Sequence, residues 1–274
     1  MIIRTLVENT SISKDLRSEH GLSLYIETKK HRLLFDLGAS TLFIENAAKL
    51  GVDLSKIDLV IVSHGHYDHG GGLKAFLNEN SKANIVLNQK AFGQYYAKKL
   101  GKENAYIGLD AALLPNDRFV FSQNRLVIDD ELEVFSNIKG KKLLPVGNKD
   151  LLKKSGISFD EDDFAHEQNL IIRENGKTLL VAGCAHNGIV NIMEHILKEE
   201  KTPIDFVIGG FHLVNPAAKR NEDPALINQI GEYLKATKIT YYTCHCTGIE
   251  PYKQLKGIMQ DNIHYLATGS EIII

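Results

Sequence analysis

The sequence of 274 residues contains no tryptophan, three cysteines and six prolines. Three cysteines are too few, and odd in number, for a disulfide framework in a chain of this length. The 32 basic and 34 acidic residues nearly balance, so the positive excess that non-specific nucleic-acid binding requires is missing. No apolar run reaches the roughly 18–20 residues of a transmembrane helix. These absences exclude a disulfide-stapled scaffold, a membrane-spanning protein and a general nucleic-acid binder.

Apolar residues make up 43% of the chain and charged residues 24%, which is typical of a globular protein. We find no internal repeat, low-complexity tract or Pro/Ser-rich linker, and therefore expect one domain over residues 1–274. The first residues do not show the basic, apolar and small-residue order of a signal peptide, which predicts a cytoplasmic location.

Short apolar runs predict two successive portions of the chain, each of which begins with β-strands and continues with a mixture of strands and helices. We expect a hairpin over 22–36, buried strands at 57–62 and 204–208, and a second hairpin over 170–182 with Asn-Gly at its turn. Helices are predicted at 41–50, 73–77, 91–100, 188–197, 224–234 and 252–259. The terminal residues 271–274 are interpreted as a paired strand. This order favours two sheets with helices packed outside them over one doubly wound sheet.

The segment His64-Gly65-His66-Tyr67-Asp68-His69 holds three histidines and an aspartate directly after a buried strand. In an extended segment, residues two apart point the same way, so His64 and His66 can offer imidazole nitrogens to one cation. Asp68 and His69 follow the strand end, where the chain can turn them toward a second position. Imidazole and carboxylate together suit zinc, iron and manganese.

Four later histidines also flank predicted strands. His166 precedes one, whereas His186, His212 and His245 follow others. If the sheets align their strand ends along one edge, these side chains converge there. The remaining histidines lack this context and are interpreted as structural or surface residues: His20, His31, His195 and His264.

The six-residue segment matches the HxHxDH signature of the metallo-β-lactamase fold, and Asp36-Leu37-Gly38 resembles the turn before that fold's first helix. Residues 184–191, 209–213 and 245–248 resemble the branch of dihydropterin ribofuranosyl-aminobenzene phosphate synthase-like proteins. The resemblance covers nearly the whole chain. It implies an α/β fold, a four-layered αββα sandwich with metal ions at one edge of the two sheets.

By position, the resemblance assigns His64 and His66 to one metal, with His166 as third ligand. It assigns Asp68, His69 and His245 to the other metal. The family's bridging aspartate is replaced by Cys184, which follows Gly183. A thiolate favours softer metals, and His186, two residues further on, can supply a ligand instead. The expected cofactor is therefore one or two divalent ions, zinc first, with iron or manganese as alternatives.

We expect a metal-dependent hydrolase that acts on a small anionic ester or phosphoester through a metal-bound hydroxide. Asp68 would orient the water, and His212 would stabilise developing negative charge. Two alternatives stay open: a transferase that condenses a dihydropterin diphosphate with ribofuranosyl-aminobenzene phosphate, and a non-catalytic metal-binding module that uses Cys184, Cys244 and Cys246. The expected partner is the small-molecule substrate, with neither nucleic acid nor membrane, and the sequence leaves the oligomeric state undetermined. Lys141, Lys142 and Lys149 are interpreted as solvated surface charge rather than substrate contacts.

Overall fold

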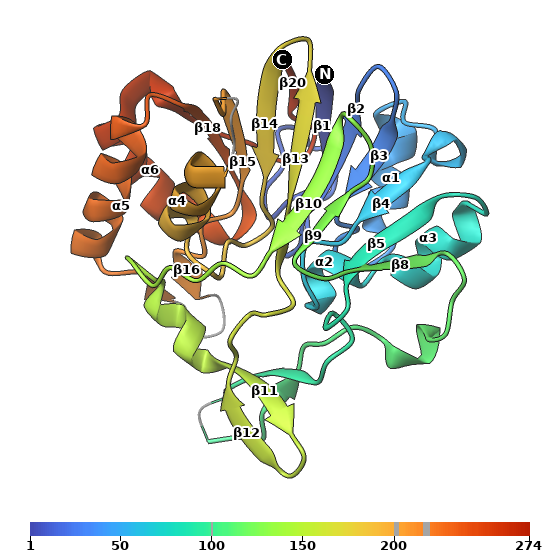
Figure 1. Cartoon of the computed structure of the whole chain (residues 1–274), viewed down its shortest axis with the longest axis horizontal. Helices are drawn as coiled ribbons and strands as arrows, with labels where there is room; N and C mark the ends of the chain where they lie inside the picture. The colour runs from blue at the N-terminus through green and yellow to red at the C-terminus, as the bar shows by residue number, and fades with distance from the viewer. Residues whose placement is uncertain (100, 200–202, 216–219) are drawn as a thin grey trace.

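The computed structural model describes residues 1–99, 101–199, 203–215 and 220–274, and two seven-stranded sheets form its centre (Figure 1). The N-terminal sheet contains, in spatial order, β20 (Glu271–Ile273), β1 (Ile2–Val7), β2 (Ser23–Glu27), β3 (Arg32–Phe35), β4 (Leu59–Ile61), β5 (Asn84–Asn88) and β8 (Phe119–Ser122). The C-terminal sheet contains β19 (Ile263–Tyr265), β18 (Thr240–Thr243), β15 (Phe206–Gly209), β14 (Lys177–Val181), β13 (Gln168–Glu174), β10 (Leu132–Ser136) and β9 (Arg125–Val127). The predicted pairing of the last strand is confirmed, because β20 runs antiparallel to β1.

Helices cover the outer faces of both sheets (Figure 1). On the N-terminal side are α1 (Leu42–Lys49), α2 (Tyr67–Gly70) and α3 (Leu73–Glu79). On the C-terminal side are α4 (Ile189–Glu199), α5 (Pro224–Ala236) and α6 (Ile249–Met259). Short 3₁₀ turns complete the described helical segments: η1 (Leu54–Lys56), η2 (Ala111–Leu113), η3 (Val146–Asp150), η4 (His245–Thr247) and η5 (Gln260–Asn262).

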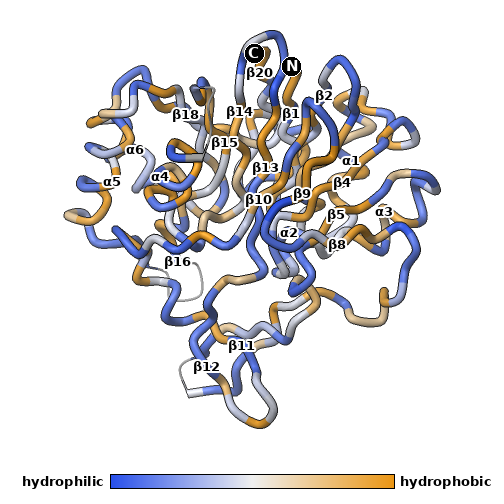
Figure 2. Tube along the Cα trace, in the orientation of Figure 1, coloured by the Kyte–Doolittle hydropathy of each residue, from blue (hydrophilic) through white to orange (hydrophobic). Residues whose placement is uncertain are grey.

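Three apolar clusters separate the four layers, as a sandwich of this kind requires. One cluster lies between the two sheets, and one lies under the helices on each side. Strand β14 shows why: Leu179 and Val181 join the cluster between the sheets, while Leu180 packs under the C-terminal helices. Because side chains alternate along a strand, a strand that is apolar on both faces must be covered on both. Figure 2 shows hydrophobic residues gathered along these central strands. The predicted αββα sandwich is confirmed.

The hairpin with Asn-Gly at its turn is also confirmed. Strands β13 and β14 pair antiparallel, and Asn175 and Gly176 both have positive φ, 53° and 73°. Two consecutive left-handed residues form the turn that matches the twist of a hairpin.

The predicted helix over 91–100 is wrong in the part that the structure describes. Residues Tyr95–Ala97 form strand β6, which pairs with β11 (Leu151–Ser155) and β7 (Ala105–Tyr106). Together with β12 (Ser158–Glu161) they form a small third sheet, and Figure 1 shows its β11–β12 hairpin projecting from one end of the sandwich. Tyr95 and Tyr96 favour a strand once partners are present, and those partners come from distant sequence.

The parallel strands of both large sheets determine where functional side chains gather. Strands β3, β4, β5 and β8 are parallel neighbours, as are β14, β15, β18 and β19. The third sheet and a two-stranded ribbon, β16 (Val214–Asn215) with β17 (Arg220–Asn221), stand near the carboxyl ends of these strands (Figure 1). None of the described helices is long and apolar enough to cross a membrane.

Candidate metal centre

The candidate site lies where strands of both large sheets end. Strand β4 runs into His64, β14 into Cys184, β15 into His212 and β18 into His245. These residues are far apart in the sequence, yet their side chains meet at one edge of the sandwich. The expected convergence is therefore found.

The first group of potential ligands consists of three buried histidines. His64, His66 and His186 offer ligand atoms that all lie within 4.8 Å of one another. The Nε2 atom of each ring is buried and makes no hydrogen bond within the described chain.

Neighbouring side chains set the orientation of two of these rings. The Ser63 hydroxyl donates to Asp36, so it accepts from Nδ1 of His64, at 2.8 Å. Asn148 Oδ1 lies 3.1 Å from Nδ1 of His186 and accepts from it. A proton held on Nδ1 leaves the lone pair of Nε2 available to a metal ion.

The second group surrounds the carboxylate of Asp68. Its Oδ2 atom lies 3.3 Å from Nε2 of His245, 3.7 Å from Nε2 of His69 and 3.2 Å from Nε2 of His20. His20, His245 and Asp68 form one candidate ligand group. His20 is exposed, as the sequence interpretation expected, but the loop before β2 also brings its ring against that of His245, so it lies at the edge of the site.

Buried acceptors also orient the histidines of this second group. Nδ1 of His69 donates to Oδ2 of Asp36 at 2.6 Å, and Nδ1 of His245 donates to Oδ1 of Asn9 at 2.8 Å. Both contacts direct Nε2 toward Asp68.

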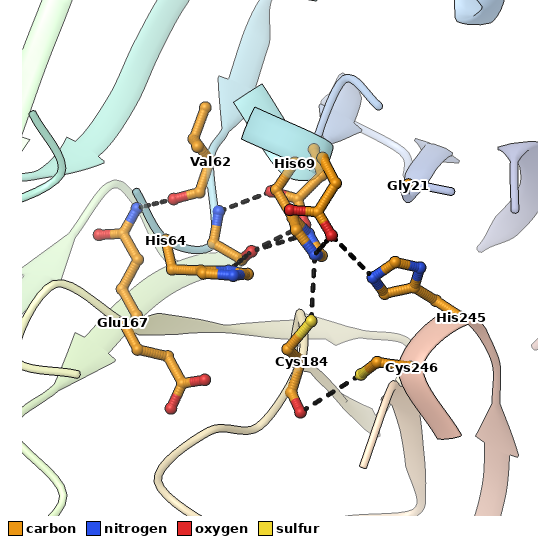
Figure 3. A network of polar contacts seen from close by, with 12 residues as sticks. Gly21, Val62, His64, His69, Glu167, Cys184, His245 and Cys246 are labelled. Atoms are coloured by element: carbon orange, nitrogen blue, oxygen red, sulfur yellow. Dashed lines mark hydrogen bonds and ion pairs between the residues drawn. The ribbon is translucent and has the colours of Figure 1, made fainter. Parts of the chain in front are cut away.

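Cys184 stands between the two groups. Its sulfur lies 3.1 Å from Nε2 of His69, a contact drawn in Figure 3. It belongs to one candidate ligand group with His64 and His69, and to another with His186 and His212. The bridging role that the family resemblance implies for Cys184 stays a prediction.

His166 lies beside the first group, but both of its ring nitrogens are used. Nδ1 accepts from the backbone N–H of Gly65 at 2.9 Å, and Nε2 donates to Oδ2 of Asp162 at 3.0 Å. Since neither nitrogen has a lone pair to spare, the hydrogen bonding favours His186 over His166 as the third ligand. The assignment of His166 stays a prediction.

Burial keeps the three histidines of the first group neutral. It lowers the pKa of His64 and His186 well below the usual value, and lowers the pKa of His66 to about 3. The adjacent imidazoles act in the same direction. Neutral imidazole is the form that binds metal ions.

The Asp68 carboxylate stays ionised despite its burial. Burial alone would raise its pKa, but the neighbouring His69 and the contacts with His20 and His245 outweigh this and hold the pKa well below the usual value. Burial likewise opposes the charged form of His69, but Asp36 and Asp68 outweigh it and raise the pKa.

A cavity of about 630 Å³ opens onto the site between the strand ends and the third sheet. Its floor includes Asp68, Cys184, His212 and other site residues. Its opposite wall comes from the third sheet and the segments beside it: Ala97, Lys98, Lys99, Ala105, Tyr106, Ile107 and Leu151. The lysines that line this cavity are Lys98 and Lys99, not the three lysines considered in the sequence analysis. Lys142 pairs with Glu194, whereas Lys141 and Lys149 line a separate cavity.

Left-handed backbone occurs at four of the strand ends that form the site. Asp36, Ala185, His212 and His245 are non-glycine residues with φ between 51° and 61°, and each follows a strand that ends there. Such conformations cost about 1–3 kcal/mol each and persist where surrounding contacts impose them.

The residues present fit a metal centre. Five buried ring nitrogens make no hydrogen bond in the described part of the chain: Nε2 of His64, His66, His186 and His245, and Nδ1 of His212. Buried polar atoms normally have partners, because an unsatisfied one costs roughly 1–3 kcal/mol. Imidazole nitrogens, an ionised carboxylate and a thiol within a few ångströms form a donor set for a divalent transition metal.

Sequence reasoning missed several residues that support the ligands: Asn9, Ser63, Asn148, Asp162 and Glu167. Glu167, for example, accepts from the backbone N–H groups of His186 and Asn187 at 2.6 and 3.0 Å and so shapes the turn after β14. Single polar residues in loops carry no periodic signal. Cys246, one of the thiols named for the metal-binding alternative, does lie in one candidate ligand group with Cys184 and His245.

Comparison with known proteins agrees with the fold and the donor set. The sequence model of the metallo-beta-lactamase superfamily matches residues 17–145. The crystal structure of Tm1679, described as a metal-dependent hydrolase of the beta-lactamase superfamily, is 30% identical with a TM-score of 0.83. The match covers 100% of this chain and 99% of that one. The chain therefore belongs to the metallo-beta-lactamase superfamily and has the fold of its metal-dependent hydrolases.

Two proteins of Methanocaldococcus jannaschii are also similar over nearly their whole length. An uncharacterized protein is 28% identical, with 94% of each chain covered. The 7,8-dihydropterin-6-methyl-4-(beta-D-ribofuranosyl)-aminobenzene-5'-phosphate synthase is 26% identical, with 98% of this chain and 95% of that one covered.

Proposed function

We propose that the protein is a metal-dependent hydrolase of a small anionic ester or phosphoester. The observation that carries the proposal is the cluster of five buried imidazole nitrogens without hydrogen bonds in the described chain, four of them in residues that line one cavity, around an ionised aspartate. Divalent ions would be held by His64, His66 and His186 and by Asp68, His69 and His245. They would lower the pKa of a bound water and polarise an oxygen atom of the substrate.

The chain's own groups would then orient the reactants. Asp68 Oδ2 is ionised and lines the cavity, so it can accept a hydrogen bond from a bound water and orient it, while its carboxylate remains fixed between His20 and His245. His212 lines the cavity, its ring 4.3 Å from that of His186 and its Nδ1 without a hydrogen bond among the described residues. We assign it to the stabilisation of negative charge that develops on the substrate.

The cavity supports a small-molecule substrate rather than a polymer. Its volume of about 630 Å³ is in the range of ligand pockets. Lys98 and Lys99, which also line the cavity, favour an anionic substrate. Replacing Lys99 with Ala should raise KM for a phosphorylated substrate and leave KM for a neutral ester unchanged.

A panel of chromogenic substrates tests the proposal: a phosphomonoester, a phosphodiester, a carboxylic ester and a lactone, each assayed with Zn²⁺, Mn²⁺ or Fe²⁺. We expect metal-dependent hydrolysis of at least one anionic member and its loss in His66→Ala. The control is His195→Ala, because His195 stacks on Phe135 outside the site. Full turnover by His66→Ala, or the absence of hydrolysis with every metal, would contradict the proposal.

A second candidate is transfer of a dihydropterin group to a ribofuranosyl-aminobenzene phosphate. It is supported by the synthase of Methanocaldococcus jannaschii, which is similar over nearly the whole chain. Incubation with a dihydropterin diphosphate and the aminobenzene phosphate separates the candidates: release of diphosphate with formation of a joined product favours the transferase, whereas simple hydrolysis favours our proposal. Tight metal binding without either reaction would indicate a metal-binding module.

A further inference from the structure

Cys246 is a buried thiol that the proposed reaction does not use. It is 3% exposed, lines the cavity and lies within 4.8 Å of the ligand atoms of Cys184 and His245. We propose that Cys246 is a metal ligand and that Cys184 and Cys246 form a two-sulfur donor set with His245. This pair would select a thiophilic divalent cation, such as Zn²⁺, over Mn²⁺ on the Asp68 side of the site. This proposal rests on the part of the proposed function that concerns metal binding, and it does not require that the protein hydrolyses a substrate.

The backbone after β18 turns two consecutive side chains toward the same cavity. Cys244 is extended, with φ −161°, and packs between the two sheets. In a continued strand, Cys246 would point the same way as Cys244, away from His245. Instead His245 has φ 51° and opens the 3₁₀ turn η4, and both His245 and Cys246 line the cavity.

The surroundings of the sulfur are built to hold it near Cys184. Gly210 leaves the space for it, because a Cβ atom added there would lie 2.5 Å from Sγ of Cys246. The backbone N–H of His212 points at the same sulfur, at 3.3 Å. The Cys246 thiol donates to the main-chain oxygen of Cys184 at 3.6 Å, as Figure 3 shows.

The distances fit a tetrahedral metal. With metal–sulfur bonds of about 2.3 Å, two thiolates on one zinc ion are about 3.8 Å apart. The ligand atoms of Cys184, His245 and Cys246 lie at most 4.8 Å apart, so the two sulfur atoms need to approach each other by about 1 Å or less to bind one ion. Nδ1 of His245 is occupied by Asn9, so Nε2 is the nitrogen that would complete the set. Binding would release the thiol protons, and thiolates favour Zn²⁺ over Mn²⁺.

Cobalt substitution tests this assignment directly, because thiolate ligands produce near-ultraviolet charge-transfer absorption that imidazole and carboxylate do not. The Co²⁺-loaded wild-type protein should show this band. Cys246→Ser and Cys184→Ser should each reduce it to about half, since two sulfurs contribute. Cys244→Ser is the matched control and should leave it unchanged. Cys246→Ser should also lower the preference for Zn²⁺ over Mn²⁺ by at least about tenfold.

A second measurement needs no variant. Alkylation of the wild-type protein, followed by mass spectrometry, should show that Zn²⁺ protects both Cys184 and Cys246. A full Co²⁺ band in Cys246→Ser, or alkylation of Cys246 at the same rate with and without Zn²⁺, would overturn the assignment while metal binding by the histidines stands. Failure to bind Co²⁺ at all would contradict the proposed function as well.

Discussion

Replacing Asp36 with Asn should weaken metal binding without contacting the metal. Oδ2 of Asp36 accepts from Nδ1 of His69 at 2.6 Å and from the Ser63 hydroxyl at 2.8 Å, and Oδ1 accepts from the Ser63 N–H at 2.7 Å. Asn keeps the shape and tolerates the left-handed backbone at φ 61°. However, the NH₂ group of Asn is a donor, and it would stand where Oδ2 of Asp36 accepts hydrogen bonds from His69 and Ser63.

The magnitude follows from what the amide leaves unpaired. A buried His69 N–H that faces another donor costs about 1–3 kcal/mol, so we expect destabilisation of about 2 kcal/mol and a Tm lowered by about 5 °C. Loss of a partner that orients a ligand typically costs about 10–100-fold in metal affinity. The weakened position should be the one that involves Asp68, His69 and His245.

The assay is competitive titration of the metal-free protein with Zn²⁺ and a chromophoric chelator. Asp129→Asn is the matched control, because Asp129 accepts from His31 at 2.7 Å in a pair outside the cavity. We expect one of two binding steps to weaken in Asp36→Asn and neither in the control. Unchanged affinity at both steps in a folded Asp36→Asn variant would refute the role of Asp36 in positioning His69.

Three further predictions follow. The pKa of His66 is about 3 in the folded metal-free protein and about 6.5 when unfolded, so the unfolded state binds more protons between these values. The free energy of unfolding should thus fall as pH drops below about 6.5, and His66 should contribute about 1.4 kcal/mol per pH unit to this fall. In His66→Gln the slope of unfolding free energy against pH, measured by chemical denaturation, should be smaller by that amount. Equal slopes in the two proteins would contradict this. Asn148→Ala should weaken Zn²⁺ binding by about 10–100-fold, because Nδ1 of His186 loses its acceptor, and unchanged titration would exclude that role. In Gly183→Ala the new Cβ would lie 2.2 Å from the Ser63 hydroxyl, so metal content should fall more than in Gly257→Ala, whose Cβ meets nothing within 4 Å; equal metal content in the two would refute this.

Much of the architecture could be predicted because it depends on local patterns. The apolar run before His64 is a strand buried on both faces, and the Asn175-Gly176 turn encodes its own hairpin. The third sheet could not be predicted, because β6 is a strand only through pairing with β7 and with the distant β11. Short segments whose conformation depends on distant partners lack a periodic signal of their own.

The candidate site was predictable in its residue types and less so in its details. Histidines at strand ends converge because parallel strands end at one edge, so the sequence led to most of the cluster. Sequence spacing could not show that both nitrogens of His166 are engaged, or that the loop carrying His20 folds over Asp68. Such details depend on hydrogen-bond partners from other segments, which only the three-dimensional structure supplies.

The most direct test of the account is the metal content of the protein purified without added metal or chelator, measured by elemental analysis beside His66→Ala and His195→Ala. We predict about two equivalents of a divalent transition metal in the wild type and in His195→Ala, and a loss of metal in His66→Ala with the fold retained. About one equivalent of metal in the wild-type protein would indicate a site that holds a single ion. Wild-type protein that contains no metal, and binds none when Zn²⁺ is added anaerobically, would contradict the metal centre on which the account rests.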